Sequence, residues 1–227
     1  MIPTIEPAQQ MVARLVGFLY LFTNATAIFA FYARGKLIVR GDAAQTARNI
    51  AASGRLLRAC IAVELITVVG VIVLLWGLYV VLKTVSRDVA LLAAFMRLAE
   101  NFVLAVVTLC EFAALATLAG AGDASQSQAL VYTFLRVYGD GFNLGFLFLG
   151  LGSAVFCYLW FKSRYVPRAL AAWGIFSSSV MAIMSLAVIV SPGLAALGLS
   201  YMMPMGVYEL GLGLWLLLKG IKVPGAE

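Results

Sequence analysis

Long apolar runs follow one another along most of the chain, and polar residues interrupt them at short intervals. Six of the runs are long enough to cross a bilayer, because a hydrocarbon core of about 30 Å needs about 20 residues of α-helix. We predict membrane-spanning helices over residues 15–33, 59–82, 89–119, 128–161, 169–190 and 201–218. The expected fold is therefore all-α, a polytopic integral membrane bundle of six transmembrane helices that forms a single transmembrane domain over residues 1–227.

The third and fourth predicted spans are too long for a simple crossing. At about 1.5 Å per residue they would measure about 46 Å and about 51 Å, so they must tilt, project from the bilayer or break. The fourth contains Gly139-Asp140-Gly141, and a glycine costs roughly 1 kcal/mol in a helix interior. Whether this span breaks near Asp140 is left open by the sequence.

Residues 34–58, between the first two spans, form the longest polar segment. Asp42 is a good N-cap, and we expect an amphipathic helix over residues 43–57. Its arginines fall on one face: Arg48, Arg55 and Arg58. Such a helix either lies on the membrane surface or forms a basic mouth that attracts anions, and the surface position is the commoner arrangement.

The composition excludes an ordinary water-soluble domain, because 63% of the residues are apolar and only 11% are charged. The formal net charge of +6 fits basic helix ends at a lipid bilayer and does not require nucleic acid. The sequence has no histidine, and its three cysteines are isolated within apolar segments. We therefore expect no metal site and no cofactor. We also expect no enzymatic activity, since no nucleophile has a positioned base.

Seven ionisable residues interrupt the apolar spans, and each would be costly in contact with lipid. On insertion scales an arginine or aspartate at a helix centre costs about 2.5–3.5 kcal/mol. These side chains must face the bundle interior or a wet cavity and find partners there. The seven residues are Glu64, Arg97, Glu100, Glu111, Arg136, Asp140 and Glu209.

Helical spacing places these charges in two polar stripes, one on the third span and one on the fourth. We expect the two stripes to face each other, with an acid from the last span approaching them. The candidate buried polar or ion-coupling site comprises Arg97, Glu100, Asn101, Arg136, Asp140, Asn143 and Glu209. Glu64 and Glu111 map near the outer leaflet and are expected to be neighbours there as secondary acids.

Five of these residues are acids and two are arginines, so three acids lack a basic partner within the spans. Such an acid must be protonated, reach the interface, accept hydrogen bonds or bind a cation. One hypothesis is a proton- or cation-linked small transporter. The alternative is a non-transporting accessory, assembly or signalling subunit, in which the buried charges only hold the helices together. Short loops and charge-free helices would then suit docking to other membrane proteins or a homo-oligomer.

The distribution of basic residues predicts the orientation. Eight lysines and arginines fall on the side of the termini, and six fall in the opposite loop over residues 34–58. The positive-inside rule therefore places the N- and C-termini in the cytoplasm.

Five stretches of the sequence, by their order and spacing, resemble those of a known family. They are GFLYL from Gly17, GKLIVRGDAAQTARNI from Gly35, LLAAFMRLAEN from Leu91, FKSRYVPR from Phe161 and ELGLGLWLLLKG from Glu209. Together they resemble the bacterial multi-pass membrane family called domain of unknown function 4386. The resemblance implies a six-helix protein of the bacterial inner (plasma) membrane, and it brings no substrate or catalytic residue.

The resemblance extends to single positions and also has departures. The family pattern coincides with Asp42, Arg97, Glu100, Pro167, Arg168 and Glu209. Arg40 stands where family members have proline. Gly152 or Ser153 stands where they often have a histidine in the fourth span, so any role of that histidine would be lost here.

Overall fold

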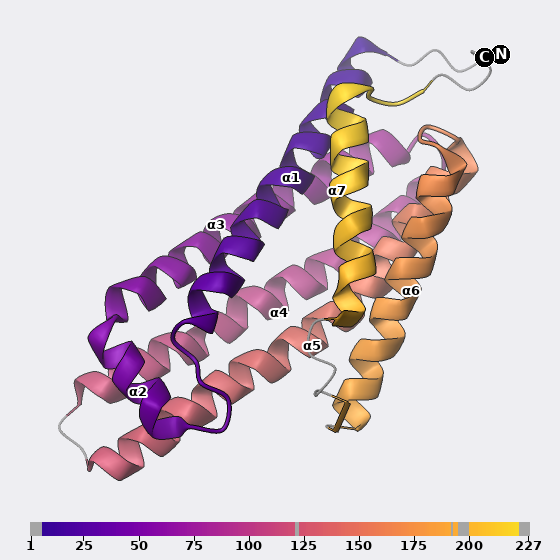
Figure 1. Ribbon diagram of the computed structural model, residues 1–227. Helices are drawn as coiled ribbons and strands as arrows, with labels where there is room; N and C mark the ends of the chain where they lie inside the picture. Colours follow the sequence, from indigo (N-terminus) through magenta and orange to yellow (C-terminus); the bar gives the residue numbers. More distant parts are fainter. Residues whose placement is uncertain (1–5, 121–122, 192, 195–199, 223–227) are drawn as a thin grey trace.

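The computed structural model describes residues 6–120, 123–191, 193–194 and 200–222, and every regular element in these segments is helical. Figure 1 shows long helices running side by side with one short helix across one end. The elements are α1 (Pro7–Gly35), α2 (Ala43–Ala52), α3 (Gly54–Leu82), α4 (Arg87–Ala119), α5 (Ala124–Ser163), α6 (Arg168–Val190), the 3-10 turn η2 (Ser200–Met202) and α7 (Met203–Leu218).

Six segments of the described chain are long and apolar enough to cross a membrane, each carrying one of the predicted spans. The predicted all-α bundle with six spans is confirmed, and the lipid bilayer is the surrounding that these helices require. Most helices extend a few residues past the predicted ends. The extension is largest in α1, which begins at Pro7 and continues through Arg34 to Gly35.

The six long helices form a ring in the order of the chain. Each packs on the next one, from α1 to α3 and onward to α7, and α7 packs back on α1 (Figure 1). Gln10 links the start of α1 to the end of α7 through two hydrogen bonds. Its Nε2 donates to the carbonyl oxygen of Lys219 at 3.4 Å, and its Oε1 accepts from the amide of Ile221 at 3.1 Å. The start of α1 and the end of α7 therefore lie at the same end of the bundle.

Helix α5 is continuous over 40 residues and does not break near Asp140. Gly141 lies directly against the side chain of Val107 on α4, where a Cβ would overlap it. The glycine therefore permits a close approach of two helices and does not act as a hinge. At about 1.5 Å per residue the helix is about 60 Å long. It extends past α6 to the end of the bundle that carries α2 (Figure 1).

The predicted helix over residues 43–57 is divided in the structure. Helix α2 ends at Ala52, and Ser53 leaves the helical conformation with φ −129° and ψ 38° before α3 begins. The buried side chains of Ile50 and Leu57 hold both sides of this corner against the ends of α4 and α5.

The start of α2 is fixed by a capping bond, because Oδ1 of Asp42 accepts from the amide of Gln45 at 2.7 Å. Replacing Asp42 by alanine is expected to remove about 1 kcal/mol of stability, the usual loss at an N-cap. Hydrogen exchange of the α2 amides measures this loss. The control is Asp42→Asn, which keeps an acceptor oxygen, and equal losses in both variants would contradict the capping role.

Candidate functional site

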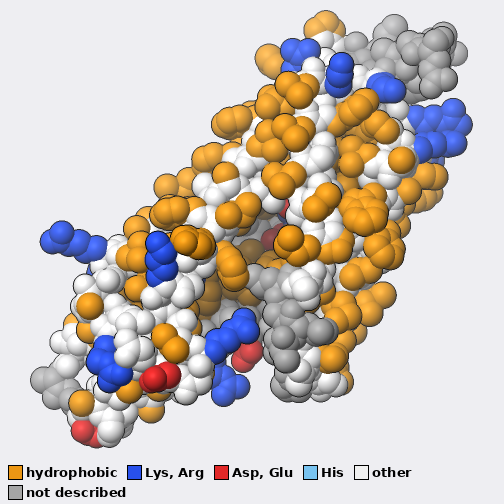
Figure 2. Space-filling view, in the orientation of Figure 1, with side chains coloured by type: hydrophobic (Ala, Val, Ile, Leu, Met, Phe, Trp, Pro, Cys, Tyr) orange, Lys and Arg blue, Asp and Glu red, His pale blue; other side chains and the backbone are white. Residues whose placement is uncertain are grey.

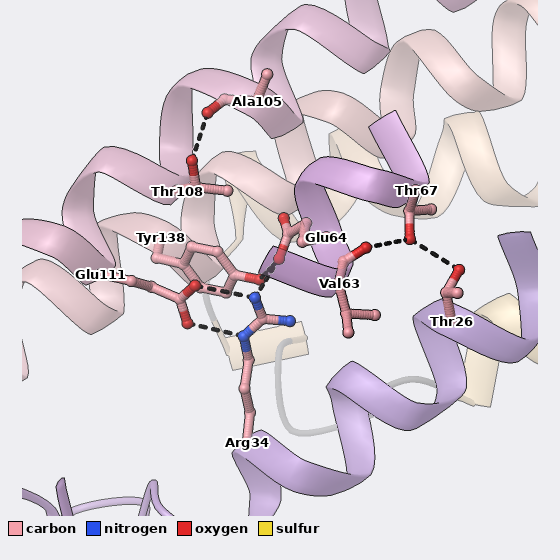
Figure 3. Close-up of polar contacts among 9 residues, drawn as sticks. All are labelled: Thr26, Arg34, Val63, Glu64, Thr67, Ala105, Thr108, Glu111 and Tyr138. Carbon is pink, nitrogen blue, oxygen red and sulfur yellow. Dashed lines mark hydrogen bonds and ion pairs between the residues drawn. The ribbon is translucent and has the colours of Figure 1, made fainter. Parts of the chain in front are cut away.

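Four buried side chains from four helices form what we call the Arg34 cluster: Arg34 (α1), Glu64 (α3), Glu111 (α4) and Tyr138 (α5) (Figure 3). Nε of Arg34 donates to Oε1 of Glu111 at 2.7 Å, and Nη2 donates to Oε2 of Glu111 at 2.9 Å and to Glu64. The hydroxyl of Tyr138 donates to Oε2 of Glu64 at 2.7 Å, and its ring lies 4.8 Å from the guanidinium. One arginine therefore joins two carboxylates and a phenol.

Glu64 and Glu111 lie together, as their positions in the sequence indicated, but their basic partner was not foreseen. Arg34 lies just outside the predicted first span, whereas helix α1 continues through Arg34, whose exposure is only 8%. The signal that could have found Arg34 is the excess of acids in the spans, because a cationic partner is one of the ways in which a buried carboxylate is compensated.

A second group, the Arg97 cluster, lies between α1, α4 and α7 and comprises Arg97, Glu100, Glu209 and Asn24. Nη1 of Arg97 lies 3.1 Å from Oε2 of Glu100, and both side chains are almost fully buried. Oε2 of Glu209 accepts from Nδ2 of Asn24 at 3.1 Å, and its charge acts on both Arg97 and Glu100. The last helix thus places a second acid near Arg97, and this acid is hydrogen-bonded to Asn24.

The Arg97 cluster has unused hydrogen-bonding capacity. Nη1 of Arg97 and Oε2 of Glu100 form an ion pair, yet neither atom has a well-aligned hydrogen-bond partner among the described residues. Glu209 is only partly buried. Figure 2 shows acidic atoms at the bottom of a hollow between α1 and α7. Beside the cluster, Nδ2 of Asn101 donates to the carbonyl oxygen of Val68 at 3.0 Å and so joins α4 to α3.

The polar residues predicted on the fourth span do not join the Arg97 cluster. Arg136 and Asp140 lie exposed on α5, and Asn143 is partly buried. Oδ1 of Asn143 accepts from the hydroxyl of Tyr201 at 2.9 Å. The prediction that the two polar stripes face each other is therefore wrong for these residues.

Glycines explain why α5 turns its charges outward. A Cβ on Gly145 would lie 2.9 Å from Cδ2 of Leu104, and one on Gly152 would lie 2.7 Å from Cγ of Arg97. Both contacts are closer than side chains tolerate, so α5 must present its glycine face to α4. Asp140 lies on a different face of α5 and points away from this contact.

The two clusters share one feature of charge. Each contains two carboxylates and one arginine, so that a fully ionised cluster has one negative charge in excess. Inside a membrane bundle a proton, a bound cation or water must compensate such a charge. The Arg34 cluster is enclosed, with Glu111 completely buried, whereas the Arg97 cluster has a partly exposed acid.

Comparison with curated proteins and with solved structures finds no match to this chain. The model of the family described as Domain of unknown function (DUF4386) matches residues 15–220. This range contains both buried clusters and all helices except the first turns of α1. The chain, a multi-pass helical membrane protein with buried ion pairs, thus belongs to the DUF4386 family.

Proposed function

We propose that the protein is a proton-linked small transporter, and that Glu100 and Glu209 carry the proton. The observation that carries the proposal is the placement of two acids near Arg97: Glu100 is enclosed and forms an ion pair with it, and Glu209 is partly exposed and interacts with it electrostatically. Two acids around one arginine can hold a single proton between them without an uncompensated charge.

The path of the proton follows from the exposure of each acid. Glu209 is the more exposed of the two acids, and in this proposal it exchanges its proton with the outside of the bundle. Glu100 is enclosed and exchanges its proton with Glu209 or with water in the bundle. Arg97 stabilises whichever carboxylate is ionised, and the amide of Asn24 orients Glu209.

The Arg34 cluster has a different role in this proposal. All three charged side chains make hydrogen bonds there, although Oε1 of Glu64 has no partner among the described residues, and four helices contribute to the cluster. The hydroxyls of Thr26 and Thr67 lie 2.7 Å apart and join α1 to α3 next to it (Figure 3). A cluster that is enclosed and hydrogen-bonded in this way fixes the helices relative to one another. We therefore assign a structural role to the Arg34 cluster and the proton pathway to the Arg97 cluster.

Proton and sodium flux into proteoliposomes tests the proposal. We expect an imposed pH gradient to drive proton entry through the unmodified protein, and Glu209→Gln and Glu100→Gln to reduce the flux to that of protein-free liposomes. Glutamine keeps the shape of the side chain but cannot carry a proton in exchange. Asp140→Asn is the matched control, because it removes an exposed acid from α5 outside the cluster.

Two results would contradict the assignment of the proton pathway to the Arg97 cluster. One is the same proton flux in all variants, and the other is a loss of flux in Asp140→Asn as large as in the two glutamine variants. Sodium flux without proton flux would replace the proton by a cation at the same acids. If the folded protein carried neither ion, the alternative of an accessory, assembly or signalling subunit would be favoured. Stable co-purification with a larger membrane protein would then support that alternative.

We propose a transport role in preference to an enzymatic one, because the sequence has no histidine to serve as a base. We further propose a bacterial inner membrane location with both termini in the cytoplasm. The positive-inside rule supports this orientation, since eight basic residues belong to the end of the bundle where α1 begins and α7 ends.

A further inference from the structure

A pocket of about 620 Å³ opens at the end of the bundle that carries α2. It lies where α2 ends and α3 begins, and the last residues of α4 form its opposite side. The side chains that matter for its chemistry are Arg55 and Arg58 from α3, and Leu115, Leu118 and Ala119 from α4. We call it the α2–α3 pocket.

The two sides of this pocket differ in chemistry. Arg55 and Arg58 are three residues apart on α3, so their guanidinium groups project from the same face. Both side chains are exposed, and within the described segments neither makes an ion pair with a carboxylate. Leu115 and Leu118 give the opposite side an apolar surface. The pocket therefore combines two available cationic groups with a hydrocarbon wall.

The position of the pocket relative to the bilayer selects its ligand. The pocket lies at the ends of two membrane-spanning helices and beside α2, which buries Ala47 and Ile50 and exposes Arg48. The ends of membrane-spanning helices are where the phosphates of a bilayer meet a protein surface. Guanidinium groups bind phosphate oxygens through paired, charge-assisted hydrogen bonds.

We propose that the α2–α3 pocket binds one anionic phospholipid. The headgroup phosphate lies between Arg55 and Arg58, and the first acyl methylenes lie along Leu115 and Leu118. Charge complementarity supplies the preference for an anionic headgroup, and the apolar wall supplies the preference for a lipid over a free anion. The inference does not depend on the proton pathway, because the pocket shares no residue with the Arg97 cluster.

Native mass spectrometry of the detergent-purified protein tests the site with phosphatidylglycerol, phosphatidylcholine of the same acyl chains, and inorganic phosphate. We expect one phosphatidylglycerol to be retained in preference to phosphatidylcholine. The double variant Arg55→Gln/Arg58→Gln should bind phosphatidylglycerol about tenfold more weakly or worse, as the loss of charge-assisted bonds implies. Both arginines are exposed, so the variant retains the fold, which a thermal melt in lipid-free detergent checks.

Arg48→Gln is the matched control. Arg48 is exposed on α2, contacts Gln45 and does not line the pocket, so its loss should leave lipid retention unchanged. Three results would overturn the proposal. These are equal weakening by Arg48→Gln, retention of phosphatidylcholine as strongly as phosphatidylglycerol, or competition by inorganic phosphate at the concentration of the lipid.

Discussion

Replacing Arg34 by methionine should lower the free energy of unfolding by about 3–5 kcal/mol, as expected when one partner of a buried ion pair is removed. Methionine fills a similar volume but leaves Glu64 and Glu111 close together and without a cation. The loss should be smaller at low pH, because protonation removes the charge of both carboxyl groups. Unfolding in detergent micelles over a range of pH measures both effects.

Two further variants separate charge from packing at this cluster. Arg40→Met removes an exposed arginine near the same end of the bundle and should change stability little. The triple variant Arg34→Met/Glu64→Gln/Glu111→Gln removes all three charges and should recover much of the lost stability. An Arg34→Met protein whose stability equals that of the unmodified protein at every pH would contradict the structural role of the cluster.

Adding a single methyl group at Gly150 should destabilise the bundle by about 2–3 kcal/mol, in the upper part of the usual range for overpacked cores. A Cβ at this position would lie 2.6 Å from the amide nitrogen of Ala182 and 2.7 Å from the carbonyl oxygen of Ser178. Both atoms belong to the backbone of α6, so α5 and α6 would have to move apart. Denaturant unfolding of Gly150→Ala in detergent micelles measures the loss.

Gly139→Ala is the matched control on the same helix, since a Cβ there meets nothing within 4 Å. This substitution should be neutral or stabilising by up to about 1 kcal/mol, because alanine favours the helix over glycine. If both alanine variants were equally stable, close contact between α5 and α6 at Gly150 would not determine the packing.

Apolar runs of membrane length predicted the number and order of the spans, because lipid requires every backbone amide to bond within its own helix. The ends of the helices were harder to predict. In the sequence, Arg34 follows the predicted end of the first span. Two carboxylates from other helices nevertheless make its burial favourable. Ser53 divides the predicted helix over 43–57. The apolar pattern gives no sign of this corner, because Ile50 and Leu57 are seven residues apart and would share a face of an unbroken helix as well.

The candidate site was predictable where the partners lie on one helix. The spacing of Arg97 and Glu100 alone implies their ion pair. The rotation of a helix about its axis depends on its neighbours, and the polar stripe of α5 was therefore wrongly expected to face the interior. Contacts at Gly145 and Gly152 instead determine that rotation and leave Arg136 and Asp140 exposed.

The ring of helices in chain order has a consequence for biosynthesis. Each helix from α3 to α6 finds its predecessor already in the membrane, so these contacts form between segments that are close in sequence. The contact between α1 and α7 closes the ring and joins segments at opposite ends of the chain. Glu209 enters the membrane with α7 and meets Arg97 and Asn24 only then. A nascent chain that ends after α6 therefore lacks the second acid, and the site is complete only once α7 has inserted.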